Sequence, residues 1–258
     1  MRGWASLYRT SVGLGARHLA RRGYLREAVV RIVVPLDPSR YLELPWALEA
    51  LALRPGDRLL DLASPKLLAV TLARSGVRVT SVDELPAEVE TWRQLAGQEE
   101  NLELTVADGR ALPFADSSYD AATSISVLEH VPDGGDALAL AELARCVRPG
   151  GTIAITLPYA ANAWVEYRDA PAYVDHGSLD GRYFFQRWYD DDALAALLGS
   201  VPELRVAHRS VVRLQPNLNA LYNRTFPLLT PLGPLFGVLA RERQGRGGDV
   251  VRLLLERT

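Results

Sequence analysis

The sequence predicts an α/β fold with a doubly wound, mostly parallel sheet of seven strands. Between residues 58 and 84, an apolar run, a helical pattern and a β-branched run follow one another, which is the order of a βαβ unit. Strand and helix patterns then keep alternating as far as residue 157. In open sheets of this kind, ligands bind beyond the carboxyl ends of the strands, so we expect the functional site there.

Composition fits one large domain in a reducing compartment. The chain has 258 residues, of which 48% are hydrophobic, so a sizeable core can form. The net charge of −2 gives no attraction to nucleic acid over the whole protein. The single cysteine, Cys146, cannot form an internal disulfide, which favours a cytoplasmic location. Arginine supplies nearly all the positive charge, as in GC-rich bacterial genes, and no apolar window is long enough to predict a transmembrane helix.

Residues 1–55 are expected to form an N-terminal helical cover, followed by an α/β domain over residues 56–258. Helical patterns around residues 16–34 and 44–53 are separated by a proline-containing turn. The first 40 residues hold eight arginines and only two acidic residues. Solvated arginines on a helical cover explain this excess, and a patch for a membrane surface or an acidic substrate is the less favoured alternative.

The first βαβ unit places acidic residues where a nucleoside would bind. The first strand carries Asp61 and leads into the short segment 63–66, and the second strand ends on Asp83. A carboxylate at the end of the second strand can accept hydrogen bonds from both vicinal hydroxyls of a ribose. We therefore expect a nucleoside site between Asp61–Lys66 and Asp83.

The remaining elements follow in regular order. Helices are expected near residues 86–96, 135–146 and 190–198, and strands at 102–106, 121–125, 152–157 and 203–214. The last strand, residues 250–255, has no room for a crossover helix before it and is expected to pair antiparallel.

Two insertions interrupt the pattern. Residues 159–188 have no clear period and are rich in aromatic and ionisable side chains, so we interpret them as an irregular substrate lid. The second insertion, residues 216–247, includes an apolar stretch at 225–240 that could pack against the lid or touch a membrane.

Five ordered segments resemble the class I S-adenosylmethionine-dependent methyltransferases, particularly the branch that acts on small molecules. They are LLDLAS (59–64), SVDE (81–84), VADGRALPF (106–114), SYDAATSISVLEHV (118–131) and VRPGGTIAITLP (147–158). The resemblance covers about residues 44–214. It implies a Rossmann-like fold, S-adenosylmethionine as the cofactor and methyl transfer to a small acceptor, which we expect to be hydrophobic or aromatic.

The resemblance also implies roles for individual residues. Glu129 and His130 would face the acceptor, and Ser126 would lie beneath the sulfonium with Ser124. The expected cofactor-binding residues are Asp61, Ala63, Ser64, Lys66, Asp83, Glu84, Asp108, Gly109 and Ser124.

The cofactor loop departs from the family pattern. Ala63, Pro65 and Leu67 stand where relatives usually carry glycines, which allow positive φ and a close backbone approach. In one explanation the loop is remodelled: Pro65 starts the following helix and Lys66 reaches the methionine carboxylate. In the other, cofactor binding is lost and the protein is a binding or regulatory module. A nicotinamide-dependent oxidoreductase is disfavoured because Gly-x-Gly-x-x-Gly is absent here.

The chemistry of methyl transfer points to one histidine. The reaction is an in-line displacement that needs a positioned, desolvated acceptor and, for oxygen or nitrogen acceptors, a base. His130 is the first candidate and Glu129 the second, although both could merely brace the next helix. His176 in the lid is a rival base.

The expected partner is a small molecule alone. The lid is expected to bind it through Tyr159, His176 and Arg187, with Arg168 as an alternative to Arg187. No His/Cys cluster predicts a metal. A nucleic-acid partner is not predicted, because no broad basic stripe lies outside the N-terminus. The oligomeric state stays open.

Overall fold

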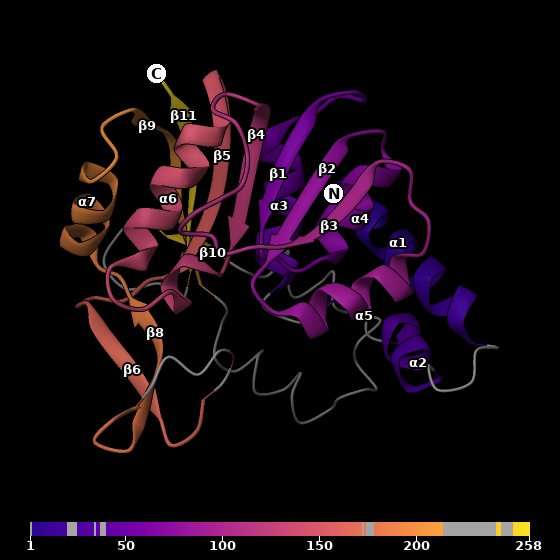
Figure 1. Ribbon diagram of the computed structural model, residues 1–258, viewed down its shortest axis with the longest axis horizontal. Coiled ribbons are helices and arrows are strands. Elements are labelled where there is room, and N and C mark those ends of the chain that lie inside the picture. Colours follow the sequence, from indigo (N-terminus) through magenta and orange to yellow (C-terminus); the bar gives the residue numbers. More distant parts are fainter. Residues whose placement is uncertain are drawn as a thin grey trace.

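The computed structural model describes residues 2–19, 25–33, 35–36, 40–171, 173, 178–213, 241–243 and 250–258. Its centre is an eight-stranded sheet in the order β10-β9-β11-β5-β4-β1-β2-β3 (Figure 1). The strands are β1 (Arg58–Leu62), β2 (Arg78–Asp83), β3 (Leu102–Val106), β4 (Tyr119–Ile125), β5 (Val147–Pro158), β9 (Leu204–Arg213), β10 (Arg241–Arg243) and β11 (Val250–Arg257).

The predicted seven-stranded sheet is confirmed, and β10 is a short addition at its edge. Strands β3, β2, β1, β4 and β5 pair in parallel, whereas β11 runs antiparallel between β5 and β9. The expectation of an antiparallel last strand is therefore also confirmed. The carboxyl ends of β1, β2 and β4 meet at one edge, because β1 lies between the other two.

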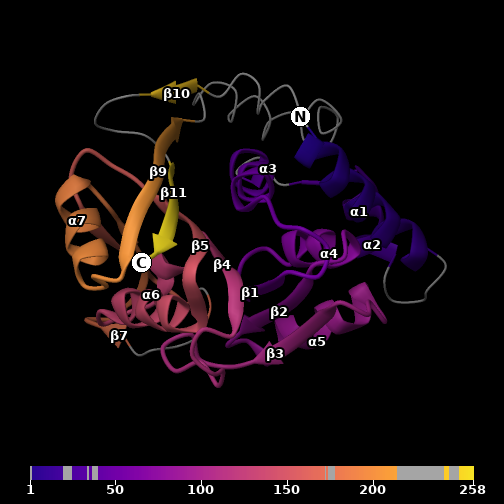
Figure 2. The ribbon, with the colours of Figure 1, turned by 90° about the horizontal axis from the view of Figure 1, so that it is seen from above.

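Helices cover both faces of the sheet (Figure 2). Side chains alternate along β1, so Leu60 packs into the core shared with α6 and α7, while Leu59 packs into the core shared with α4 and α5. These helices are α4 (Leu67–Arg74), α5 (Pro86–Ala96), α6 (Gly135–Cys146) and α7 (Asp191–Gly199). The predicted bounds of α6 and β3 are reproduced.

Three helices precede the sheet: α1 (Arg2–His18), α2 (Leu25–Val33) and α3 (Arg40–Leu51). One continuous helix around residues 16–34 was expected, and that expectation is wrong. Instead α1 and α2 pack against each other at Gly15, where an added Cβ would lie only 2.6 Å from the Ala28 carbonyl oxygen. A single continuous helix could not bring these two residues, 13 positions apart, into contact.

The lid, residues 159–188, is more regular than expected. It contains a three-stranded antiparallel sheet of β6 (Trp164–Arg168), β7 (Ser178–Leu179) and β8 (Arg182–Trp188). Trp164 and Trp188 stack across β6 and β8, with ring centroids 5.6 Å apart. Cross-strand aromatic pairs stabilise such ribbons even where no simple alternation of apolar and polar residues shows in the sequence. Most of the second insertion, including residues 225–240, lies outside the described residues.

Candidate active site

A cavity of about 510 Å³ lies at the carboxyl ends of β1, β2 and β4. Its size is within the range of small-molecule sites. The cofactor loop forms one wall and the lid forms another. The lining residues are Arg40, Ala63, Ser64, Pro65, Lys66, Asp83, Glu84, Leu85, Glu88, Ile125, Ser126, Val127, His130, Val131, Tyr173, Phe184 and Phe185.

The cofactor loop keeps a glycine-like backbone without glycine. Ala63 has a φ of +50°, in the left-handed region that glycine favours, and its amide donates to the Val82 carbonyl at 2.7 Å. This conformation costs an alanine about 1 kcal/mol or more. The following residue, Ser64, is held to β4, because its Oγ accepts a hydrogen bond from the Ile125 amide at 3.0 Å. The loop is thus held to both β2 and β4 at the cavity wall.

Asp61 is buried beneath the loop and does not line the cavity. Its carboxylate accepts hydrogen bonds from Ser81 Oγ at 2.6 Å and from Thr123 Oγ1 at 2.8 Å. Burial raises the pKa of Asp61, and the nearby Lys66 charge opposes that rise. Asp61 therefore ties β1 to β2 and β4 where the three strands reach the site.

Lys66 and Asp83 form a buried ion pair in the cavity wall. The distance from Lys66 Nζ to Asp83 Oδ2 is 2.8 Å, and the side chains are 2% and 9% exposed. The other carboxylate oxygen of Asp83 accepts from the Leu85 amide at 3.1 Å. Lys66 was expected to reach toward a methionine carboxylate, but here its ammonium contacts the residue expected to bind the ribose.

The other expected cofactor residues are divided between the cavity and its surroundings. Glu84 lines the cavity, whereas Asp108, Gly109 and Ser124 are not among its lining residues. Asp108 forms a half-exposed ion pair with Arg110 at 2.8 Å. Gly109 packs tightly on Leu62, whose Cδ1 would lie 2.8 Å from an added Cβ. The Ser124 hydroxyl is buried with no hydrogen-bond partner in the structure.

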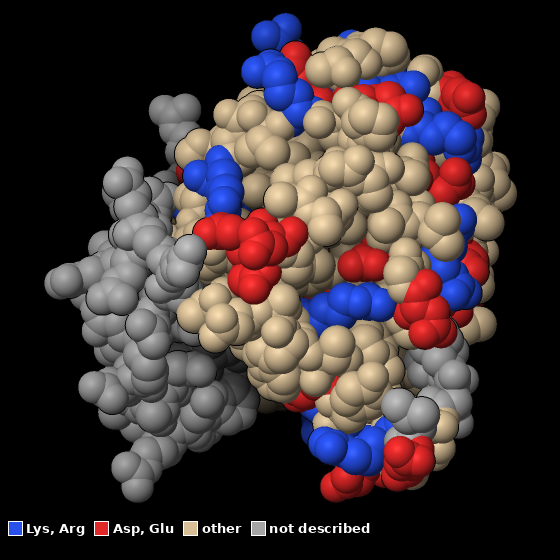
Figure 3. Space-filling view, turned by 90° about the vertical axis from the view of Figure 1, so that its left-hand side faces the viewer, with Lys and Arg blue, Asp and Glu red and all other residues tan. Residues whose placement is uncertain are grey.

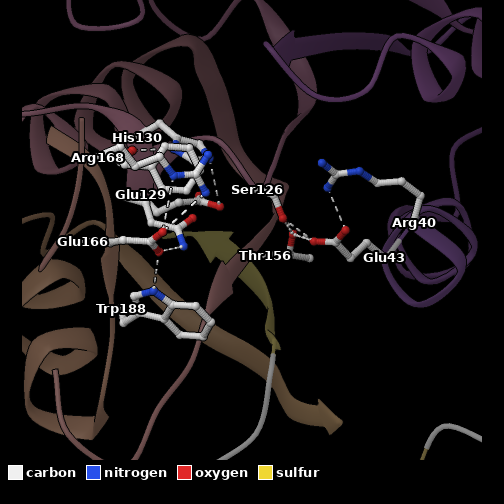
Figure 4. Close-up of polar contacts among 11 residues, drawn as sticks. Arg40, Glu43, Ser126, Glu129, His130, Thr156, Glu166, Arg168 and Trp188 are labelled. Carbon is white, nitrogen blue, oxygen red and sulfur yellow. Dashed lines mark hydrogen bonds and ion pairs between the residues drawn. The ribbon is translucent and has the colours of Figure 1, made fainter. Parts of the chain in front are cut away.

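The geometry of His130 defines its neutral tautomer. Nδ1 lies 2.7 Å from the Phe185 carbonyl oxygen (Figure 4). Because a carbonyl can only accept, Nδ1 carries the hydrogen and Nε2 of the neutral ring has a free lone pair. Burial lowers the pKa of His130, which favours this neutral form at pH 7. A histidine in that state can accept a proton at Nε2.

Glu129 lies near the Nε2 side of the His130 ring, with 3.8 Å between its Oε1 and His130 Nε2. The side chain is buried, and Oε2 has no hydrogen-bond partner in the structure. Burial raises the pKa of Glu129 to about 8. At neutral pH the group is mostly a carboxylic acid, so of the two residues only His130 is ready to act as a base.

Replacing Glu129 by glutamine is expected to remove a pH-dependent loss of stability. The folded-state pKa of about 8 lies above the ordinary value of 4.5, so the wild type loses stability as pH rises from about 4.5 to 8. Above pH 8 the loss should reach a few kcal/mol, at about 1.4 kcal/mol per pKa unit. Urea unfolding at pH 5, 7 and 9 should show that the free energy of unfolding of the Glu129→Gln variant, relative to that of the wild type, increases with pH. Parallel pH profiles would contradict the assignment.

One buried carboxylate, Glu43, was not predicted from the sequence. Its Oε2 accepts from Arg40 Nη1 at 2.8 Å, and its Oε1 accepts from Thr156 Oγ1 at 2.7 Å and from Ser126 Oγ (Figure 4). Glu43 therefore connects α3 to the ends of β4 and β5, and its partners Arg40 and Ser126 line the cavity. An acid among the apolar residues of α3 was the signal that could have indicated it.

The lid contributes an aromatic wall. Tyr173 and Phe185 lie with ring centroids 4.9 and 5.0 Å from that of His130. Two other lid residues expected to bind substrate do not line the cavity. Tyr159 donates from its hydroxyl to Asp191 at 2.6 Å, and Arg187 donates to the Val131 carbonyl, which holds the cavity wall. His176 lies outside the described residues.

Over the part of the chain that the structure describes, two kinds of site are absent. Within it, no three His, Cys, Asp or Glu side chains gather in a way that could hold a metal ion. No helix there has the length and apolar character needed to cross a membrane.

Known proteins resemble this chain over its central sheet. A family described as "Methyltransferase domain" matches residues 60–155, which run from β1 to β5. A demethylmenaquinone methyltransferase of Corynebacterium kroppenstedtii is 29% identical over 67% of this chain and 78% of its own length. That of Corynebacterium efficiens is 36% identical over 42% of this chain and 44% of its own. A solved S-adenosylmethionine-dependent methyltransferase from Methanosarcina mazei shares the fold, with a TM-score of 0.53 and 15% identity over 80% of this chain and 94% of that one.

Proposed function

The chain belongs to the class I S-adenosylmethionine-dependent methyltransferases, and we propose that it methylates a small aromatic or otherwise hydrophobic acceptor. One observation carries the proposal: a single cavity is lined by the Asp83 carboxylate, by His130 and by the lid aromatics. The Asp83 carboxylate suits a nucleoside, and His130 suits a proton transfer. Tyr173 and Phe185 suit a flat apolar acceptor and the exclusion of water.

The residues of the cavity fit the cofactor chemically. Asp83 would accept hydrogen bonds from the ribose hydroxyls, and Lys66, released from Asp83, would pair with the methionine carboxylate. Glu84 and Leu85 would lie beside the adenine, with Asp108 and Gly109 as its further proposed contacts. When bound, S-adenosylmethionine supplies an electrophilic methyl group on a sulfonium.

His130 is the residue we propose to act on the acceptor. Its Nε2 would remove a proton from an acceptor oxygen or nitrogen, and that atom, or a ring carbon conjugated with it, would attack the methyl group. The Phe185 carbonyl and the tilted Phe185 ring, with its centroid 5.0 Å from that of the imidazole, hold His130 in place. The neutral Glu129 near Nε2 would serve as a positioning residue. The relatives are named demethylmenaquinone methyltransferases, so a demethylmenaquinone-like compound is the first acceptor to test.

Two measurements test the proposal. Isothermal titration with S-adenosylmethionine and S-adenosylhomocysteine should show binding at one site. Methyl transfer from labelled S-adenosylmethionine to demethylmenaquinone analogues should yield a labelled product extractable into organic solvent. Absence of cofactor binding would overturn the proposal. Cofactor binding without methyl transfer to any aromatic acceptor would overturn the proposed acceptor class and leave only the proposed cofactor site.

Replacing His130 by alanine is expected to lower kcat about 10²- to 10⁴-fold, the usual contribution of a general base. Cofactor affinity should change little, because no backbone contact of the loop depends on the ring. In the wild type, kcat should rise with pH and level off near neutrality, since burial lowers the pKa of His130 below 6.5. The matched control is His208→Ala, which removes an exposed histidine on β9. Equal rates in the two variants would contradict the assignment.

The buried Lys66–Asp83 pair also supports a second candidate, a cofactor-independent binding or regulatory module. In that case the ammonium would permanently occupy the ribose position. Titration of the Lys66→Ala variant distinguishes the two. Weaker cofactor binding than in the wild type favours the methyltransferase, whereas no binding by either protein favours the module.

A further inference from the structure

Helix α2 presents an apolar face to solvent. Leu25, Val29, Val30 and Val33 are 59%, 43%, 46% and 37% exposed, and their spacing places them on one side of the helix. The opposite side is already used, because Ala28 is buried against α1 at Gly15. The exposed side therefore contributes nothing to the core that the described residues form. Contiguous apolar patches of this kind mark interaction surfaces.

Helix α1 extends the same patch. Val12 and Leu19 are 37% and 46% exposed and lie about one turn on either side of Gly15, the point of contact with α2. Both positions lie near the contact between α1 and α2, so the two neighbouring helices each expose apolar side chains. We call Val12, Leu19, Leu25, Val29, Val30 and Val33 the apolar patch.

Exposed arginines lie on the two helices that carry the apolar patch. One of them, Arg17, also pairs with Glu99 at 3.3 Å. Arg9, Arg17 and Arg26 are exposed on the same two helices, and the first 40 residues carry a net charge of +6 from eight arginines and two acids. The face of the molecule that carries α7 shows acidic and basic side chains interspersed (Figure 3). The positive excess is therefore particular to the N-terminal helices in a chain whose net charge is −2.

We propose that the apolar patch of α1 and α2 docks the protein on an anionic phospholipid bilayer. Apolar side chains flanked by arginine are the pattern of helices that lie in the plane of a membrane surface. The arginines would approach the phosphate groups while the valine and leucine side chains enter the boundary with the acyl chains. The charge distinguishes this partner from a second copy of the chain, whose patch would bring like charges together.

The position of the patch connects it to the active site. A second cavity of about 460 Å³ is lined by Val30 and Arg26 at one side and by Lys66 at the other. It shares Arg40, Pro65, Lys66 and Glu88 with the active-site cavity. A docked protein would thus hold this cavity between the bilayer and the cofactor loop. Delivery of a hydrophobic acceptor by this route rests on the proposed function, whereas the docking itself does not.

Flotation of the full chain with vesicles tests the docking. The wild type should float with phosphatidylglycerol vesicles, less with phosphatidylcholine vesicles, and less again at high salt. The double substitution Val29→Ser, Val30→Ser should weaken binding about tenfold or more, because it withdraws apolar groups from the acyl boundary. Arg26→Gln should weaken it about fivefold, with no apolar surface removed.

The matched control is Leu138→Ser, which removes a 55% exposed leucine from α6, on the other face of the sheet, and should float like the wild type. Thermal unfolding checks that each variant is folded. If the double variant does not fold, the flotation of Arg26→Gln still tests the proposal. No flotation of the wild type overturns the proposal. So does concentration-dependent dimerisation that the double variant abolishes, which would assign the patch to a second copy. Methyl transfer to a water-soluble acceptor analogue should be unchanged in the Leu138→Ser variant.

Discussion

Replacing Asp83 by asparagine is expected to destabilise the protein by about 3–5 kcal/mol, the usual cost of leaving one member of a buried ion pair uncompensated. Lys66 is 2% exposed, so its ammonium stays poorly solvated when its partner is lost. The same change removes the carboxylate proposed to bind the ribose, so cofactor binding should fall by about 100-fold or more. Urea unfolding and titration calorimetry measure the two effects separately.

A double variant separates stability from binding. Adding Lys66→Met to Asp83→Asn removes the uncompensated ammonium and should restore most of the lost stability, because uncharged groups often replace buried ion pairs at little cost. Cofactor binding should not return. Asp108→Asn is the matched control for stability: its ion pair with Arg110 is half exposed, and its loss should cost less than about 1 kcal/mol. If Asp83→Asn lowered the free energy of unfolding by as little as Asp108→Asn does, the buried ion pair would not have the stabilising role assigned to it.

Replacing Glu43 by alanine is expected to cost about 3–5 kcal/mol as well. The change removes the acceptor for the hydroxyls of Ser126 and Thr156 and the partner of Arg40. Glu43→Gln retains the shape and one acceptor oxygen, so its cost should be about 1–3 kcal/mol. Both variants should also weaken cofactor or acceptor binding, since Ser126 and Arg40 line the cavity.

Urea unfolding at pH 7 measures these costs. The control is Glu49→Ala on the same helix, where the side chain is exposed and the change should stay within about 0.5 kcal/mol. Equal stabilities of the Glu43→Ala and Glu49→Ala variants would show that the buried network contributes nothing.

The fold was predictable because its signals are local. Strand and helix periodicity predicted β1 to β5, the helices between them and the antiparallel β11. The break between α1 and α2 was not predictable from periodicity alone, because it depends on the contact between Gly15 and Ala28. The strands of the lid depend on pairing between β6 and β8, which lie some 20 residues apart.

The candidate site was predictable in part, for the same reason. Motif positions indicated Ala63, Asp83 and His130, which the structure brings to one cavity. The pairing of Lys66 with Asp83 and of Glu43 with Thr156 joins residues 17 and 113 positions apart. No spacing rule connects such residues, because the sheet order that brings them together arises only in the folded chain.

The hydrogen bond from His130 Nδ1 to the Phe185 carbonyl links the lid to the proposed base. Phe185 belongs to β8, so this strand determines which imidazole nitrogen carries the hydrogen. If β8 withdraws by more than about an ångström, that bond is lost, the tautomer is no longer specified and the ring is free to rotate. Because β8 also carries two aromatic residues of the cavity wall, its withdrawal would expose the cavity to water and misalign His130 at the same time. Under the proposed role of His130, deprotonation of the acceptor would therefore be confined to the enclosed state.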